Sequence, residues 1–255
     1  MKIMTFNLRV HIKEDGADAW PNRVLSAAKL IQESGAAVIG VQEARRSMLE
    51  DLQKELPHYS WIGRSRSEES LDEHCAVFYN DNALQLETQD TFWLSDTPEV
   101  PASVSWDASF PRICTWAKFK HLKNQQSSFY VFNTHLDHVG ETARINGVRL
   151  IQNFIGSQNY SPFIVLGDFN AKPASPAIQQ LDKTEPTFLN TFGSQQNIGK
   201  TFHDFKGGDG GEPIDYIFVS NDISYLPAEI LRNKIDGRFP SDHYPVITSV
   251  QLPIS

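Results

Sequence analysis

Phe163-Ile164-Val165-Leu166-Gly167-Asp168-Phe169-Asn170 is an apolar run that ends in a carboxylate and a carboxamide two residues apart. Because side chains along a strand alternate between its two faces, the run predicts a buried strand that presents Asp168 and Asn170 on one side. Four other segments join a short apolar strand to polar residues in the same way, namely residues 3–7, 37–43, 129–135 and 214–218. The repetition predicts one site that is built from the ends of several strands.

Predicted helices alternate with these strands. Residues 20–31 carry apolar side chains at helical spacing, with Pro21 near the start and Gly35 after the end. Ser47 and Glu50 have the spacing of a capping box, which predicts that a second helix begins at Ser47. The other predicted elements are strands at 75–79, 92–95 and 113–119, a helix at about 143–155, and a short helix that begins with Ser175 and Pro176. This alternation is typical of an α/β protein.

The chain has 255 residues, of which 40% are hydrophobic, so it can bury a large core. No linker-like stretch divides it, and the polar strand ends run from Asn7 to His243, so we predict one domain over residues 1–255. No run of about 20 apolar residues predicts a membrane span, and the N-terminus lacks the apolar core of a secretory signal. We therefore expect a cytoplasmic protein, and nothing in the sequence indicates a protein partner. Cys75 and Cys114 lie in apolar segments, which predicts buried thiols.

Six polar motifs follow one another along the chain: Thr5-Phe6-Asn7, Gln42-Glu43, Asn133-Thr134-His135-Leu136, Gly167-Asp168-Phe169-Asn170, Ile214-Asp215-Tyr216-Ile217-Phe218 and Ser241-Asp242-His243. In this order they resemble the endonuclease/exonuclease/phosphatase superfamily of metal-dependent phosphoesterases. Other segments resemble a bacterial branch related to its deadenylase-type members. The resemblance spans essentially the whole chain. It implies a four-layer α/β sandwich, in which two packed, mostly antiparallel β-sheets are flanked by helices.

Three of the motif residues are predicted to bind a metal. Glu43 ends an apolar strand, and a carboxylate there suits Mg²⁺ or Mn²⁺, which prefer oxygen ligands. The resemblance makes Glu43 the principal ligand. It implies that Asn7 supplies a neutral oxygen or orients Glu43, and that Asp242 turns a carboxylate toward a metal. The sequence leaves open whether one ion binds or two.

Four residues are predicted to carry the chemistry, and phosphoester hydrolysis needs an attacking water and neutralised phosphoryl oxygens. The resemblance implies that Asp168 orients or deprotonates the water, and that the Asn170 amide donates to a phosphate oxygen. His243 would meet the phosphate as a cation or as an acid-base group, while Asp215 would hold the His243 imidazole in the required tautomer. A turn after a buried strand is the alternative interpretation of Asp168 and Asn170.

Three further residues are predicted near the substrate. The resemblance implies that His135 contacts the phosphate or transfers a proton. His138 lies in the same motif, with an exposed loop position as the alternative. Arg112 lies where relatives place an arginine that approaches the site, and its guanidinium suits phosphate oxygens. A surface salt bridge is the alternative interpretation of Arg112.

These patterns together predict a Mg²⁺- or Mn²⁺-dependent phosphoester hydrolase. The net charge of −8 argues against nonspecific binding of duplex nucleic acid, so a nuclease-like phosphodiesterase is expected to act on single-stranded nucleic acid ends or small nucleotides. The alternative is a phosphomonoesterase for a sugar phosphate or another small phosphate. A non-catalytic binding module of the same fold is disfavoured, because it should lack some of the motif residues and none is missing.

Overall fold

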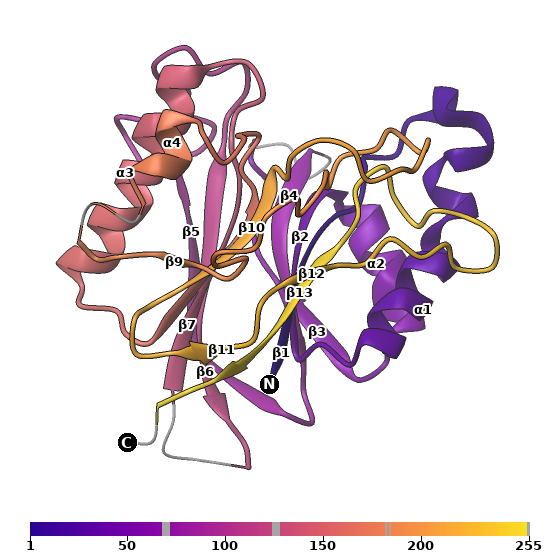
Figure 1. The fold of residues 1–255 in the computed structure, drawn as a ribbon, viewed down its shortest axis with the longest axis horizontal. Helices are drawn as coiled ribbons and strands as arrows, with labels where there is room; N and C mark the ends of the chain where they lie inside the picture. Colours follow the sequence, from indigo (N-terminus) through magenta and orange to yellow (C-terminus); the bar gives the residue numbers. More distant parts are fainter. Residues whose placement is uncertain (68–71, 124–127, 182, 184, 254–255) are drawn as a thin grey trace.

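Two β-sheets packed face to face form the centre of the molecule (Figure 1). The computed structural model describes residues 1–67, 72–123, 128–181, 183 and 185–253. Helices cover the outer face of each sheet, which gives the order helix, sheet, sheet, helix. The predicted four-layer α/β sandwich is confirmed.

The first sheet has the strand order β11-β13-β1-β2-β4-β3, with β12 paired to β13. Only β1 and β2 run parallel among its described strands, and the other pairs are antiparallel. Its strands are β1 (Lys2–Asn7), β2 (Val38–Arg45), β3 (Tyr59–Ile62), β4 (Glu73–Asn80), β11 (Ser224–Tyr225), β12 (Glu229–Ile230) and β13 (Val246–Gln251). The sheet therefore joins the first strand of the chain to the last.

The second sheet has the strand order β5-β6-β7-β8-β10-β9. Among its described strands only β7 and β8 run parallel. Its strands are β5 (Leu84–Trp93), β6 (Ile113–His121), β7 (Ser128–His135), β8 (Phe163–Asp168), β9 (Leu189–Asn190) and β10 (Asp215–Val219). Each sheet thus holds one parallel pair beside antiparallel neighbours, and the polar strand ends of both sheets meet between them.

The helices bury one apolar face each against a sheet. Helices α1 (Val24–Ser34) and α2 (Arg46–Glu55) pack on the first sheet, where Ile31 and Leu49 contact its apolar outer face. Helices α3 (Glu141–Ser157) and α4 (Pro176–Gln179) cover the second sheet, and Ile151 belongs to the core that extends between the sheets. Two 3-10 helices, Lys13–Asp18 and Trp20–Asn22, precede α1. No helix in the described ranges is long and apolar enough to cross a membrane.

The predicted starts of the first two helices differ from the structure. Helix α1 begins at Val24, because residues 20–22 form a separate 3-10 helix, but it ends as predicted at Gly35, which has φ of 64°. The capping box at Ser47 was a wrong prediction. Strand β2 continues to Arg45, which becomes the N-cap of α2 without a side-chain bond, and Glu50 instead pairs with Arg46 at 2.9 Å. The prediction that Cys75 and Cys114 are buried thiols is confirmed.

Gly167 lets β8 approach β7 at the position just before Asp168. Its φ is 150°, and a Cβ added there would lie 2.0 Å from the carbonyl oxygen of Thr134. Because that atom is backbone within a paired strand, it cannot move aside without breaking the β7–β8 ladder. A glycine is therefore required at the end of the strand that carries Asp168.

We expect Gly167→Ala to lower the free energy of unfolding by about 3 kcal/mol or more, because it forces overlap with a strand backbone. Urea unfolding monitored by circular dichroism measures the change. Gly210→Ala is the matched control, since a Cβ at Gly210 meets nothing within 4 Å. A Gly167→Ala protein as stable as the Gly210→Ala protein would contradict the close approach of β7 and β8.

Candidate active site

A pocket of about 330 Å³ opens where the polar strand ends of the two sheets meet. Eight of the ten predicted site residues line it: Glu43, Arg112, His135, His138, Asp168, Asn170, Asp242 and His243. Asn7 and Asp215 are buried behind the pocket, where Asn7 contacts Glu43 and Asp168, and Asp215 contacts His243. The structure therefore brings all ten together.

Strand pairing alone places three of these residues at one level. The parallel β7–β8 register sets His135 opposite Asp168, and the antiparallel β10–β8 register sets Asp215 opposite Asp168. His243, in the loop before β13, joins this level through its Nδ1, which lies 2.9 Å from Asp215 Oδ2, and an isolated bridge pairs it with Phe202. The alignment explains why polar residues at separate strand ends share one pocket.

Asn7 joins the two sheets through its side-chain amide. Its Nδ2 donates to Glu43 Oε1 and to Asp168 Oδ2, both at 3.0 Å, and its Oδ1 accepts from the Arg9 backbone amide at 2.9 Å. Glu43 Oε2 also accepts from the Val10 backbone amide at 2.9 Å. Of the two predicted functions of Asn7, these bonds favour orientation of Glu43.

Glu43 leaves the regular strand path at a β-bulge. The β2–β4 register shifts between Val41 and Ala44, and Glu43 lies in this interval with φ of 57°. A left-handed conformation is uncommon for a residue other than glycine and costs on the order of 1 kcal/mol or more. The bulge turns the Glu43 side chain into the pocket while Gln42 stays fully buried.

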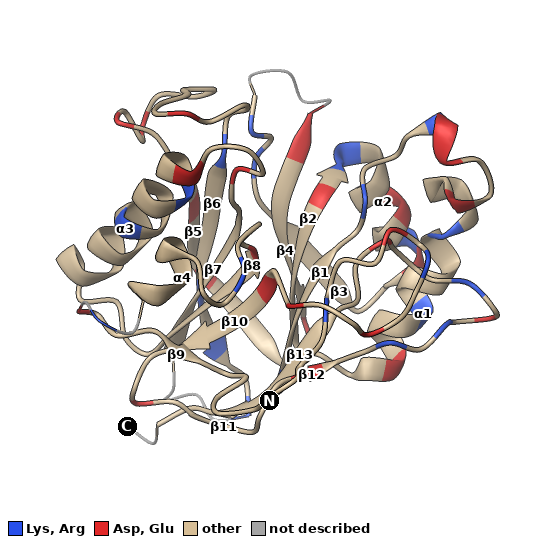
Figure 2. Ribbon diagram, turned by 45° about the horizontal axis from the view of Figure 1, so that its top comes forward, with Lys and Arg blue, Asp and Glu red and all other residues tan. Residues whose placement is uncertain are grey.

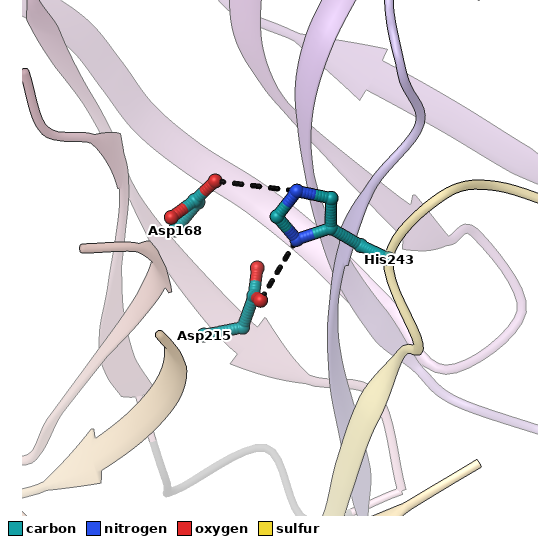
Figure 3. A group of neighbouring side chains, drawn as sticks. All are labelled: Asp168, Asp215 and His243. Carbon is teal, nitrogen blue, oxygen red and sulfur yellow. Dashed lines mark hydrogen bonds and ion pairs between the residues drawn. The ribbon is translucent and has the colours of Figure 1, made fainter. Parts of the chain in front are cut away.

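His243 lies between two buried carboxylates, Asp168 and Asp215 (Figure 3). Its Nδ1 is 2.9 Å from Asp215 Oδ2, and its Nε2 is 3.8 Å from Asp168 Oδ2. Burial lowers the pKa of His243, but the charges of Asp215 and Asp168 outweigh it and raise the pKa to about 10. The imidazole is therefore protonated near neutral pH, and Nδ1 donates to Asp215.

Asp168 has an environment that weakens its acidity. Burial and the negative charge of Asp215 raise the pKa of Asp168 to about 7, although His243 and two hydrogen bonds act in the opposite direction. Those bonds come from the Asn170 backbone amide to Oδ1, at 2.8 Å, and from Asn7. A carboxyl group with a pKa near 7 can take up a proton at neutral pH.

His135 and Asn170 are bonded to each other. Burial and the positive charge of Arg112 hold the pKa of His135 well below its usual value, so its imidazole is neutral. Asn170 Nδ2 lies 3.0 Å from His135 Nε2 and donates at 3.0 Å to the Leu136 carbonyl oxygen. Both amide protons of Asn170 are thus engaged within the protein, and a phosphate that accepts from Asn170 has to replace one of these partners.

Arg112 forms a buried ion pair with Asp137 and not a surface salt bridge. Its Nε lies 3.2 Å from Asp137 Oδ2, and its Nη2 lies 3.1 Å from His138 Nδ1. The His138 side chain is exposed at the pocket rim, where it stacks on Phe110 at 5.8 Å between ring centroids. His138 is therefore both an exposed loop residue and a pocket residue.

Two groups of side chains could hold a metal ion. Asp168, Asp215 and His243 offer ligand atoms within 4.8 Å of one another, and Asp215 Oδ1 is buried without a hydrogen-bond partner among the described residues. However, His243 is protonated there and repels a cation. Glu43 and Asp242 line the same pocket with oxygen atoms, and burial together with the Glu43 charge raises the pKa of Asp242. Two carboxylates that line one pocket and act on each other electrostatically suit a divalent cation, which would lie there beside the Arg9 guanidinium, 3.8 Å from Asp242 Oδ2.

The pocket has a second wall that the motifs do not identify. It contains Arg66 and Glu73, which form an ion pair at 2.9 Å, and the ring of Phe110. Figure 2 shows acidic positions at the ends of β2 and β4, where Glu43 and Glu73 lie. Glu73 begins a strand instead of ending one, and Arg66 lies in a loop, so neither has the strand-end pattern. The segment Glu73–Tyr79 is one of those that resemble the bacterial branch, so Glu73 had this weaker signal, whereas Arg66 had none.

Comparison with known proteins finds similar structures over nearly the whole chain. A structure of an endonuclease/exonuclease/phosphatase family protein from Bacteroides thetaiotaomicron is 29% identical, with a TM-score of 0.94 over 100% of this chain and 98% of that one. A mannosyl-6-phosphatase from the same organism is 29% identical, with a TM-score of 0.92 over 99% of this chain and 100% of that one. The human Nocturnin catalytic domain shares the fold at 18% identity, with a TM-score of 0.76 over 98% of this chain and 93% of that one.

The model of the endonuclease/exonuclease/phosphatase family matches residues 4–243, a range that contains all ten predicted site residues. The first and last matched residues lie in β1 and in the loop before β13, so the match includes both sheets. The chain belongs to the endonuclease/exonuclease/phosphatase family, whose members are phosphoester hydrolases.

Proposed function

We propose that this chain is a Mg²⁺-dependent phosphomonoesterase, with residues 1–255 acting as one catalytic domain, and that its substrate is a small phosphorylated alcohol of the sugar phosphate class. The observation that carries the proposal is the pocket: its volume of about 330 Å³ is at the small end of the range for ligand sites. The similarity to a mannosyl-6-phosphatase over nearly the full length of both chains supports the same substrate class.

The charges around the pocket also favour a small substrate. Arg112 is paired with Asp137, Arg66 with Asp72 and Glu73, and Arg9 with Asp15. A nucleic acid strand needs cations that are available to several successive phosphates. Because these arginines are already paired with carboxylates, the pocket suits one phosphate group better than a chain of them.

In this proposal Glu43 and Asp242 would bind the metal. Asn7 orients Glu43 through the hydrogen bond that its Nδ2 donates. Oxygen ligands of this kind suit Mg²⁺, with Mn²⁺ as the alternative. The ion would neutralise charge on the phosphoryl oxygens and so favour attack by water.

Asp168 is proposed as the group that orients the attacking water and takes its proton, because its pKa of about 7 allows proton uptake at neutral pH. Water oxygen forms the new bond to phosphorus, and the bond from phosphorus to the alcohol oxygen breaks. The alcohol oxygen gains one proton in exchange for the proton that Asp168 takes. The products are the free alcohol and inorganic phosphate.

His243 is proposed to stabilise the phosphoryl charge as a cation. Asp215 fixes its orientation through Nδ1, and Nε2 faces Asp168, 3.8 Å from its Oδ2 (Figure 3). The neutral His135 and the Asn170 amide complete the phosphate contacts in this proposal. Arg112 and His138 line the same pocket, and in this proposal they would contact the substrate beyond its reacting centre.

A nuclease-like phosphodiesterase acting on single-stranded ends or small nucleotides is the second candidate. Phe110 and Phe202 line the pocket, and each leaves more than two fifths of its surface exposed, at 45% and 43%. Exposed rings of this kind can stack on bases. The two candidates share the same phosphate chemistry and differ in the group that the rim contacts.

Substrate preference distinguishes the two candidates. With Mg²⁺ we expect the protein to release inorganic phosphate from mannose 6-phosphate at least tenfold more efficiently than it cleaves a single-stranded oligonucleotide, because paired arginines do not attract a polyanion. Phosphate release and gel analysis of the oligonucleotide measure the two kcat/KM values. A preference for the oligonucleotide would replace the first candidate with the second.

Loss of Glu43, the proposed metal ligand, and loss of His243, the proposed cation beside the phosphate, should each reduce turnover. We expect Glu43→Gln and His243→Ala to lower kcat at least about 100-fold, and Glu43→Gln to raise the Mg²⁺ concentration needed for half-maximal activity. Activity is measured against Mg²⁺ and Mn²⁺, with a chelator as the metal-free reference. Glu50→Gln is the control, because Glu50 forms an exposed pair within α2. Folded Glu43→Gln and His243→Ala proteins with full activity would refute the assignment.

Asp168 should reduce the stability of the metal-free protein at neutral and higher pH. Its folded-state pKa of about 7 exceeds the ordinary value of 3.8, so its contribution to stability is present below pH 3.8 and is lost as the pH rises through about 7. We therefore expect Asp168→Asn to abolish activity but to gain more stability, relative to the parent, at pH 8 than at pH 5. Urea unfolding in chelator measures both differences, and equal differences at the two pH values would contradict the raised pKa.

A further inference from the structure

We propose that Arg66 and Glu73 form a hydroxyl-binding wall that recognises the alcohol part of the substrate, in particular two neighbouring hydroxyl groups of a sugar. This inference rests on the proposed phosphomonoesterase function and concerns the part of the pocket that the phosphate chemistry does not use. Both residues line the pocket together with Phe110, at some distance in sequence from every predicted site motif.

The Arg66 guanidinium is held rigidly by its neighbours. Its Nε lies 3.0 Å from Asp72 Oδ1, its Nη1 lies 2.9 Å from Glu73 Oε2, and its central carbon lies 4.9 Å from the centre of the Phe110 ring. Only 11% of the Arg66 side chain and 17% of the Glu73 side chain are exposed. A group fixed in this way loses little conformational entropy when it binds a ligand.

With respect to the residues that the structure describes, the pair retains hydrogen-bonding capacity on both partners. A guanidinium has five N–H donors, and the two carboxylates occupy one donor on Nε and one on Nη1. A carboxylate has about four acceptor positions, and Arg66 occupies one on Glu73 Oε2. A donor and an acceptor lie side by side, and two adjacent hydroxyl groups, each of which donates and accepts, match this arrangement.

The charge of the wall favours hydroxyls over a second phosphate. Arg66 carries one positive charge, whereas Asp72 and Glu73 carry two negative charges, and the adjacent pair of Arg112 and Asp137 is neutral. The resulting negative balance repels a second phosphate but accepts a neutral polyol. Phe110 adds an apolar ring surface, which suits the C–H face of a sugar.

The test compares a substrate that has hydroxyl groups with one that has none. Mannose 6-phosphate and phenyl phosphate share the reacting phosphate, so the ratio of their kcat/KM values reports recognition of the alcohol part. We expect Glu73→Gln and Arg66→Lys to lower this ratio about 10-fold to 100-fold, because each variant removes a hydrogen bond to a charged group. Glu87→Gln is the matched control, since Glu87 pairs with Lys118 at 3.0 Å on β5 and β6, outside the pocket, and it should keep the parent ratio.

The outcomes separate this inference from the proposed function. A parent protein that hydrolyses neither substrate would overturn the proposed function and this wall with it. A parent that hydrolyses phenyl phosphate but shows no preference for mannose 6-phosphate or another sugar phosphate would overturn the wall alone. Equal losses on both substrates in Glu73→Gln, or weaker Mn²⁺ binding measured by calorimetry without substrate, would instead assign Glu73 to the phosphate or metal chemistry.

Discussion

A buried hydrogen bond from Asn7 Nδ2 to Asp168 Oδ2 connects the two sheets beneath the candidate active site. It joins residues that are 161 positions apart in the chain, and it forms only when the ends of β1 and β8 face each other across the sheet interface. A second buried hydrogen bond, from Gln42 Nε2 to Asn133 Oδ1 at 2.7 Å, also connects the two sheets, because Gln42 lies in β2 and Asn133 in β7. Because unpaired buried polar groups are costly, these bonds allow only one relative placement of the sheets.

That placement concentrates negative charge in a buried space. Asp168 and Asp215 lie opposite each other in paired strands, and His243 between them is charged in response. The raised pKa of Asp168 reflects the free-energy cost of burying its charge next to Asp215. A packed apolar core would carry no such cost. The same environment makes Asp168 able to accept a proton near pH 7, so the group that weakens the fold is the group that the proposed reaction needs.

A buried arginine connects the segment that follows β1 to the segment that precedes β13. Arg23 is fully buried, and its guanidinium donates to the carbonyl oxygens of Leu8, Arg9 and Pro240. Leu8 follows Asn7, and Pro240 lies two residues before Asp242, so one side chain sets the spacing between both sides of the site. Carbonyl oxygens rather than a carboxylate bind this guanidinium, and Asp242 lines the pocket with its Oδ2 3.8 Å from Arg9 Nε.

The sequence by itself determined the strands that end in polar residues, because a short apolar run followed by polar side chains is a local property that 163–170 displays without its neighbours. It also indicated the family, since the order of the motifs is a property of the chain. It did not determine the start of α2, where the continued pairing of β2 displaced the local capping signal of Ser47. Only the tertiary structure decided that both Asn170 amide protons are engaged, that Arg112 is neutralised by Asp137, and that Arg66 and Glu73 share the pocket. These facts depend on contacts between distant segments, and such contacts leave no periodic trace in the sequence.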